Sequence, residues 1–189
     1  MRRLLLALPF TLLPLAATQA AEDEHAHEHE HAEHSSLAAH EHGAAQLNVA
    51  LDGNTLELAL ESPTMNIVGF EHAAVSASDQ AAAAKAKQQL QDPLALFSIA
   101  PGADCSVTKL EVASLVFAAA TAATKNASEH SDVDADYALT CNHPEQLQGI
   151  DLSELFKRFP ATQKIQVQLI GPKGQQGSEL SPANPRLKF

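Results

Sequence analysis

The stretch AAQLNVALDGNTLELALES, residues 44–62, indicates the fold class of this chain. Large aliphatic side chains occupy every second position on either side of the turn-forming tripeptide Asp52-Gly53-Asn54. These aliphatic residues are Leu47, Val49, Leu51, Leu56, Leu58 and Leu60. A period of two, interrupted by a glycine-containing turn, predicts a β-hairpin with one face toward a core and the other toward water.

The chain beyond this hairpin predicts a mostly-β domain. The same alternation returns in KIQVQLIGPKGQQGSEL, residues 164–180, which predicts a second hairpin that turns within residues 171–177. One or two strands are expected within residues 96–117, where Pro101-Gly102 interrupts the pattern. Further strands are expected in DYALTC at 136–141 and as a short edge strand at 186–189. We therefore expect a β-sandwich or half-barrel, while the strand order cannot be read from the pattern.

Two segments predict short helices, and one predicts a loop. Residues 78–90 are rich in alanine, with Ser78 or Asp79 as the expected cap and Asp92-Pro93 as the stop signal. The sequence DLSELFKRFP, residues 151–160, predicts a second helix that Asp151 caps and that has one apolar face. Residues 118–136 are small, polar and acidic, and predict a flexible loop.

The amino terminus predicts export from the cytoplasm. Two arginines precede an apolar run at residues 4–16, and small residues follow up to Ala20, so residues 1–20 are expected to form a cleaved signal peptide. No later segment is apolar enough to span a membrane. Residues 21–42 contain one large aliphatic residue and no aromatic residue, which predicts disorder, and residues 43–189 are expected to form a single domain.

The charge balance and the cysteines narrow the class of protein further. The chain has 23 acidic residues against 12 lysines and arginines, a formal charge of −11, which argues against binding to nucleic acid or anionic lipid. In an exported chain, Cys105 and Cys141 predict a disulfide worth ~3–4 kcal/mol on the chain-entropy model. The alternative is a pair of thiolate metal ligands, which an oxidising compartment disfavours.

Histidines are concentrated before the first predicted strand. Seven of the ten lie between residues 25 and 42, at His25, His27, His29, His31, His34, His40 and His42. Imidazole and carboxylate together suit zinc, and imidazole also suits copper and nickel. Ordering a flexible chain costs about 1–2 kcal/mol per residue, so this histidine tract predicts exchangeable binding of several ions more than a rigid centre. A solvated acidic spacer is the alternative interpretation.

A defined site is expected where the tract meets the fold. His40 and His42 adjoin the first strand, and His72 is predicted near them if the second strand leads back beside the first. A second candidate is an accessory cation site in the acidic loop, at His130, Asp132 and Asp134, with a solvated loop as the alternative.

No catalytic signature such as G-x-S-x-G or H-E-x-x-H is present, so we expect a protein that is not an enzyme.

Several of these segments together resemble a known family. AHEHGAAQLNVALDGNTLELALESPTMNIVGFEHAA (39–74), the pairing of Cys105 with YALTC, LFKRFP and IQVQLIGPKGQQ are similar to the ZrgA-like family of periplasmic, zinc-regulated, zinc-binding proteins. The resemblance covers about residues 38–189. It implies periplasmic zinc binding that assists uptake, in partnership with a zinc uptake transporter.

The resemblance also implies site residues. Its motif positions are His40, His42 and His72, with Glu71 in the same motif. Family members often carry a histidine- and aspartate-rich insertion between the two cysteines. The insertion is short here, so the amino-terminal tract is favoured over this loop as the metal-binding segment.

The alternative function is a β-domain adaptor that docks a membrane partner and carries the tract as an accessory metal-binding segment.

Overall fold

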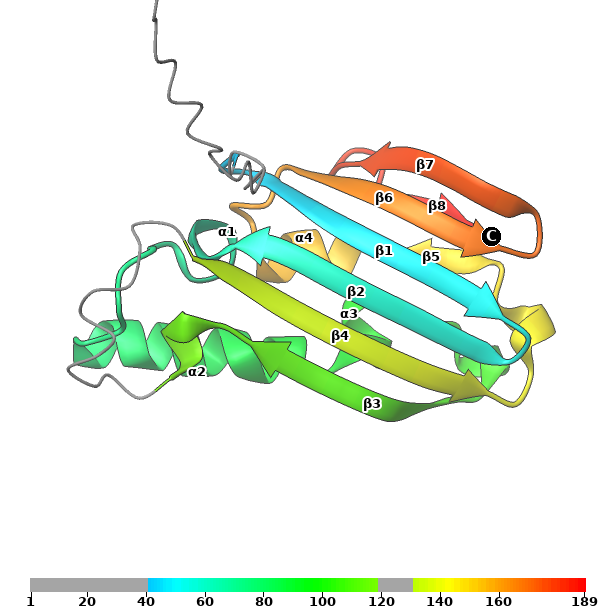
Figure 1. The fold of residues 1–189 in the computed structure, drawn as a ribbon, viewed down its shortest axis with the longest axis horizontal. Helices are drawn as coiled ribbons and strands as arrows, with labels where there is room; N and C mark the ends of the chain where they lie inside the picture. The colour runs from blue at the N-terminus through cyan, green and yellow to red at the C-terminus, as the bar shows by residue number, and fades with distance from the viewer. Residues whose placement is uncertain (1–40, 119–130) are drawn as a thin grey trace, which may run out of the picture. The chain divides into compact units, whose positions relative to one another are not determined.

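The computed structural model describes residues 41–118 and 131–189. The predicted signal peptide, the histidine tract up to His40 and residues 119–130 of the predicted loop lie outside these ranges. The described strands are β1 (Ala44–Asp52), β2 (Thr55–Pro63), β3 (Cys105–Ala113), β4 (Asp132–Cys141), β5 (Gly149–Asp151), β6 (Lys164–Gly171), β7 (Gly174–Leu180) and β8 (Arg186–Lys188). Six of them form one sheet in the order β3-β4-β2-β1-β6-β7, and β5 pairs with β8 in a second sheet (Figure 1).

The hairpin predicted from residues 44–62 is confirmed. Strands β1 and β2 pair antiparallel from Gln46↔Glu61 to Asp52↔Thr55, which leaves a two-residue turn. Gly53 in this turn has φ +57°, a conformation that glycine adopts without steric cost. The leucines and the valine of the alternation are all buried, so the predicted inward face is the observed one.

The two predicted hairpins join through the centre of the sheet. Strand β1 pairs in parallel with β6, from Ala44↔Lys164 to Ala50↔Ile170. On its other side β2 pairs antiparallel with β4, and β4 pairs with β3. The amino-terminal strand therefore lies in the middle of the sheet, between segments that are far apart in the sequence.

The six-stranded sheet has one covered face and one open face. Figure 1 shows the helices and the small β5-β8 sheet behind it. The inward side chains of β1, β2, β4 and β6 form one buried cluster with helix and loop residues that include Leu90, Phe97 and Phe156. Exposed polar side chains such as Asn48, Glu57 and Gln168 occupy the opposite side of these strands. The mostly-β class is confirmed, and the second layer consists of helices and a small sheet.

Residues 41–118 and 131–189 contain four α-helices where the sequence predicted two. They are α1 (Thr64–Val68), α2 (Ala77–Leu90), α3 (Pro93–Leu96) and α4 (Ser153–Arg158). Helices α1 and α3 have five and four residues, too few to show a helical period. Of the one or two strands expected within residues 96–117, only β3 forms, because residues 97–100 make an irregular connection between α3 and the 3₁₀ turn η1 (Pro101–Ala103).

The caps of the two predicted helices differ slightly from expectation. Helix α2 starts one residue before the predicted range, and its cap is Ser76, whose side chain accepts a hydrogen bond from the backbone N–H of Asp79 at 3.1 Å. In α4 the N-cap position is Leu152, and Asp151 accepts from the backbone N–H of Ser153 at 2.8 Å. Helix α2 is the longest described helix, with 14 residues, and no described helix is long and apolar enough to cross a membrane.

The predicted flexible loop at 118–136 is wrong for its last five residues. Strand β4 begins at Asp132, four residues before the predicted strand at 136–141. Acidic residues alternate there with the buried Val133, Ala135 and Tyr137, which is a strand pattern. The abundance of carboxylates concealed this pattern, because charged residues are common in loops.

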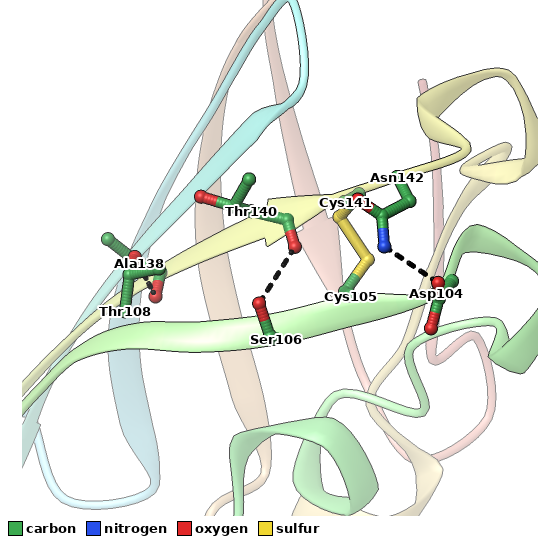
Figure 2. Close-up of a disulfide and its surroundings, with 8 residues drawn as sticks. All are labelled: Asp104, Cys105, Ser106, Thr108, Ala138, Thr140, Cys141 and Asn142. Atoms are coloured by element: carbon green, nitrogen blue, oxygen red, sulfur yellow. Dashed lines mark hydrogen bonds between the residues drawn. A yellow bond between two sulfur atoms is a disulfide. The ribbon is translucent and has the colours of Figure 1, made fainter.

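The disulfide that the sequence predicted joins the edge strand β3 to its neighbour β4. Cys105 at the start of β3 lies opposite Cys141 at the end of β4, and the two are bonded (Figure 2). Beside the bridge, the Ser106 and Thr108 hydroxyls donate to backbone carbonyls of β4. These contacts hold an edge strand that has a register shift between Val107 and Lys109 and contributes little buried surface of its own.

Candidate metal centre

The described part of the candidate site begins at a tight turn before β1. The backbone N–H of Ala44 donates to the carbonyl of Glu41 at 2.9 Å, and His42 lies inside this turn. Gly43 has φ +86°, so a side chain at this position would strain the backbone. The carbonyl of Gly43 accepts hydrogen bonds from the backbone N–H groups of Gln163 and Lys164, at 2.7 and 2.9 Å. The residue that follows His42 is therefore fixed to the start of β6.

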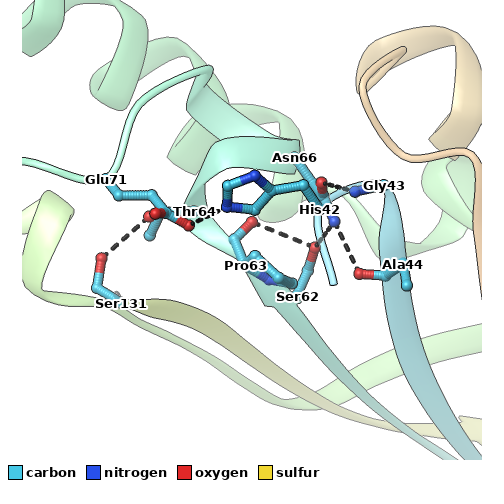
Figure 3. Close-up of polar contacts among 9 residues, drawn as sticks. All are labelled: His42, Gly43, Ala44, Ser62, Pro63, Thr64, Asn66, Glu71 and Ser131. Atoms are coloured by element: carbon cyan, nitrogen blue, oxygen red, sulfur yellow. Dashed lines mark hydrogen bonds and ion pairs between the residues drawn. The ribbon is translucent and has the colours of Figure 1, made fainter. Parts of the chain in front are cut away.

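Asn66 binds the same stretch of backbone (Figure 3). Its side-chain oxygen accepts from the N–H of Gly43 at 2.7 Å, and its amide nitrogen donates to the carbonyl of Ala44 at 2.8 Å. The same nitrogen donates to the hydroxyl of Ser62 at 3.2 Å. Asn66 is 2% exposed and lies on α1, so this short helix is tied directly to the start of β1.

Helix α1 is also tied to the start of β4. The backbone N–H of Thr64 donates to the carbonyl of Ser131 at 2.9 Å, and the two hydroxyls lie 3.0 Å apart. The helix ends at Gly69, two residues before Glu71. The segment that leads to Glu71 is thus anchored to β1 and β4 at the same end of the sheet.

The structure brings His42 and Glu71 together. Nε2 of His42 lies 3.0 Å from Oε1 of Glu71 (Figure 3). The His42 side chain is 52% exposed, whereas that of Glu71 is 12% exposed. An imidazole open to solvent is therefore supported by a carboxylate that is largely covered by the fold. Imidazole and carboxylate are both zinc ligands, so the chemistry of this pair fits that ion.

A second pair fastens the turn to β6. Nζ of Lys164 lies 3.0 Å from a carboxylate oxygen of Glu41, and this hydrogen bond raises the pKa of the lysine above its ordinary value. Lys164 remains charged at neutral pH. It places one cation near the candidate site and partly neutralises the acidic turn.

His72 lies on the same segment but makes different contacts. Its Nδ1 lies 3.0 Å from the carbonyl of Ala73, and its ring stacks on Phe70 with centroids 4.7 Å apart. Within residues 41–118 and 131–189, no group of three or more His, Cys, Asp or Glu side chains is arranged to hold a metal ion. His72 therefore does not complete a site with His42 and Glu71 in the described structure.

The predicted accessory site falls partly on strand β4. Asp132, Asp134 and Asp136 occupy alternate positions there, and Asp134 lies opposite Glu61 of β2. Partial burial, then the negative charges of Asp132 and Asp136, raise the pKa of Asp134. His130, the remaining member of that prediction, lies outside the described residues, as do His25, His27, His29, His31, His34 and His40.

Asn66 is the residue of this region that sequence reasoning missed. A buried asparagine with three hydrogen bonds is recognisable only when its partners are known, because they come from residues 43, 44 and 62. The one signal in the sequence was local: Asn66 lies between Pro63 and Gly69, two residue types that interrupt regular secondary structure.

These observations define a disulfide-bridged, mostly-β protein that presents an imidazole–carboxylate pair where the histidine-rich segment enters the fold. The model of the ZrgA family, described as zinc uptake protein, matches residues 39–189, and the chain belongs to this family. The resemblance seen in the sequence is confirmed. No curated protein matches the chain. Family membership indicates a role in zinc uptake, a process defined by transport of an ion and not by a catalysed reaction.

Proposed function

We propose that this protein binds zinc in the periplasm, buffers it and assists its uptake. The observation that carries the proposal is the 3.0 Å pair of His42 and Glu71, in a chain of a zinc uptake family. His42 is the last histidine of the tract and lies two residues before the first strand. An ion held here is cargo, and the protein itself performs no reaction.

The histidine tract supplies the remaining ligands in this proposal. Two side chains do not satisfy the four-coordinate preference of zinc, so further donors are required. His40 is two residues from His42 and is the nearest candidate. The histidines at positions 25–34 collect ions in exchanging arrangements, and the anchored pair offers a site whose backbone is already ordered. Ions therefore move from the tract toward the fold.

The proposed location of the protein is the periplasm, and its proposed partner is a membrane transporter. The amino-terminal pattern of a signal peptide and the bond between Cys105 and Cys141 support an oxidising, extracytoplasmic compartment. A protein that gathers zinc there must deliver it to a membrane transporter, which is the proposed partner. Copper and nickel also bind imidazole, and copper competes most strongly, so selectivity depends on which ion is available.

Zinc binding at His42 is tested in a variant that lacks most of the other tract histidines. In the full chain, the five tract histidines at positions 25, 27, 29, 31 and 34 are replaced by glutamine, which leaves the region around His42 unchanged. We call this the tract-silent protein. His42→Ala in this protein is expected to weaken zinc binding by more than about a hundredfold, beyond the usual effect of losing an outer partner, measured by competition with a chromogenic chelator.

A matched control exists on the same fold. His143 also lies beside a carboxylate, with Nδ1 3.5 Å from Glu145, and its side chain is 60% exposed. His143→Ala removes a comparable imidazole–carboxylate pair away from the histidine tract and is expected to leave zinc affinity unchanged. Equal losses in the two variants would show that the His42 site is not specific. Absence of tight zinc binding by the unmodified full chain would refute the proposed function.

A further inference from the structure

The contact between His42 and Glu71 assigns a proton to one ring nitrogen. A carboxylate oxygen only accepts, so the 3.0 Å hydrogen bond requires an N–H at Nε2 of His42. In the neutral imidazole the other nitrogen, Nδ1, then carries the free lone pair. A metal ion binds such a lone pair, and the structure therefore directs metal binding to Nδ1.

The exposure of the two side chains points the same way. Glu71 is 12% exposed, and His42 is 52% exposed, so an ion arriving from solvent meets the imidazole more readily than the carboxylate. In metal sites the ligating histidine almost always donates its other ring N–H to a carboxylate or a carbonyl, which fixes the ring and strengthens the ligand.

The backbone on both sides of the His42–Glu71 hydrogen bond is held in place, as a histidine ligand oriented by a carboxylate requires. Asn66 binds both Gly43 and Ala44, directly after His42, and it lies on the helix that precedes Glu71. Asn66 therefore ties the backbone next to His42 to the helix that leads to Glu71. The ring orientation is set before an ion arrives.

We propose that Glu71 is a positioning residue that acts through His42, and that His42 binds zinc through Nδ1 without Glu71 as a ligand. This inference rests on the proposed function and deepens it. It replaces the prediction from the family resemblance, in which Glu71 was grouped with the metal ligands. The anchored site is then completed by imidazoles or carboxylates other than Glu71.

Substitution of Glu71 by glutamine separates the two roles. The glutamine oxygen still accepts the hydrogen bond from Nε2 of His42, whereas the neutral amide is a poor substitute for a carboxylate ligand. In the tract-silent protein, Glu71→Gln is expected to weaken zinc binding by about tenfold, the lower end of the usual effect of losing an outer partner. Glu71→Ala is expected to cost more, up to about a hundredfold, because the ring loses its acceptor.

Cobalt(II) substituted for zinc shows directly whether Glu71 is a ligand of the ion. The visible absorption spectrum of bound Co(II) depends on the number and type of its ligands. It is expected to be the same in tract-silent protein with Glu71 and with Glu71→Gln. Circular dichroism confirms that each variant is folded, and Glu71→Gln, with an isosteric side chain, remains informative even if Glu71→Ala does not fold.

The outcomes distinguish this inference from the proposed function. A Glu71→Gln variant with an altered Co(II) spectrum, or with a loss of affinity as large as that of His42→Ala, would show that Glu71 is a ligand. Unchanged zinc affinity in both Glu71 variants would show that the carboxylate has no role. Unchanged affinity in His42→Ala would instead refute the site itself.

Discussion

The hydroxyl of Tyr137 donates a hydrogen bond to the backbone carbonyl of Leu90, 2.9 Å away. Tyr137 lies on the inward face of β4, and Leu90 is the last residue of α2, so the bond joins the sheet to its longest covering helix. The ring of Tyr137 also meets Phe97 edge-to-face, with centroids 5.4 Å apart. Burial raises the pKa of this hydroxyl, which therefore stays protonated as a donor.

Tyr137→Phe is expected to lower the free energy of unfolding by roughly 1–3 kcal/mol, because it leaves the buried carbonyl of Leu90 without its donor. The aromatic contact with Phe97 survives in the variant, so the loss reports the hydrogen bond. Urea denaturation followed by circular dichroism measures the change. Equal stability of the two proteins would show that water or another group satisfies Leu90.

Asp134→Asn is expected to stabilise the protein at neutral pH by a few tenths to about 1 kcal/mol, because partial burial and the charges of Asp132 and Asp136 disfavour the carboxylate. Glu61, which lies directly opposite on β2, adds a further like charge. The raised pKa of Asp134 means that the folded state favours its protonated form, so native stability falls as pH rises through this pKa. The gain should therefore be present at pH 7 and absent near pH 3, where the native carboxyl is already protonated.

The same Asp134→Asn variant tests the predicted accessory cation site. A cation bound to Asp134 would stabilise the native protein and oppose the gain expected from the substitution. Urea denaturation at pH 7 with and without added zinc measures both effects. A stabilising effect that is the same in both conditions excludes Asp134 as a zinc ligand.

The local parts of this fold were predictable from the sequence, and the long-range parts were not. The hairpin around Gly53, the α2 helix and the pairing of Cys105 with Cys141 follow from alternation, capping signals and cysteine count. The parallel pairing of β1 with β6 leaves no signal in either strand, because hydrogen bonds between backbones carry no sequence code. The start of β4 was missed for a different reason, since its outward positions are acidic.

In the candidate site, too, single residues were predictable from the sequence, whereas the contact between them was not. His42 was predicted because it adjoins the first strand, and Glu71 came only through the family resemblance. Their 3.0 Å contact depends on the placement of α1 between β2 and the segment at residues 69–72. Five residues are too few for a helical period to be recognised, so neither the helix nor the role of Asn66 could be inferred.

Replacement of both Cys105 and Cys141 by serine is expected to lower the free energy of unfolding by ~3–4 kcal/mol on the chain-entropy model. The bridge lies where β4 ends, whereas the contact between Thr64 and Ser131 that supports the candidate site lies where β4 begins. Zinc affinity should therefore be unchanged in the folded variant. A parallel loss of zinc affinity would show that the two ends of the sheet are coupled.

Asn66→Ala is expected to lower the free energy of unfolding by roughly 1–3 kcal/mol and to weaken zinc binding as well. The substitution removes the acceptor for the N–H of Gly43 and the donor to the carbonyl of Ala44, so the turn that carries His42 loses one of its two attachments. Asn48→Ala, on the exposed side of β1, is the matched control and should change neither quantity. A loss of stability without any loss of affinity would restrict Asn66 to the fold.

His72→Ala tests the last ligand that the sequence predicted within the described structure. Nδ1 of His72 donates to the carbonyl of Ala73, and the ring stacks on Phe70, so its position is fixed by its own segment and not by His42. We expect His72→Ala in the tract-silent protein to retain the zinc affinity of its parent within about twofold, whereas the loss of a true ligand should exceed the usual tenfold effect of an outer partner. The chelator competition that measures His42→Ala measures this variant too. A loss as large as that of His42→Ala would show that His72 is a ligand. The binding atom would then be Nε2, because Nδ1 carries the proton of the hydrogen bond to the Ala73 carbonyl.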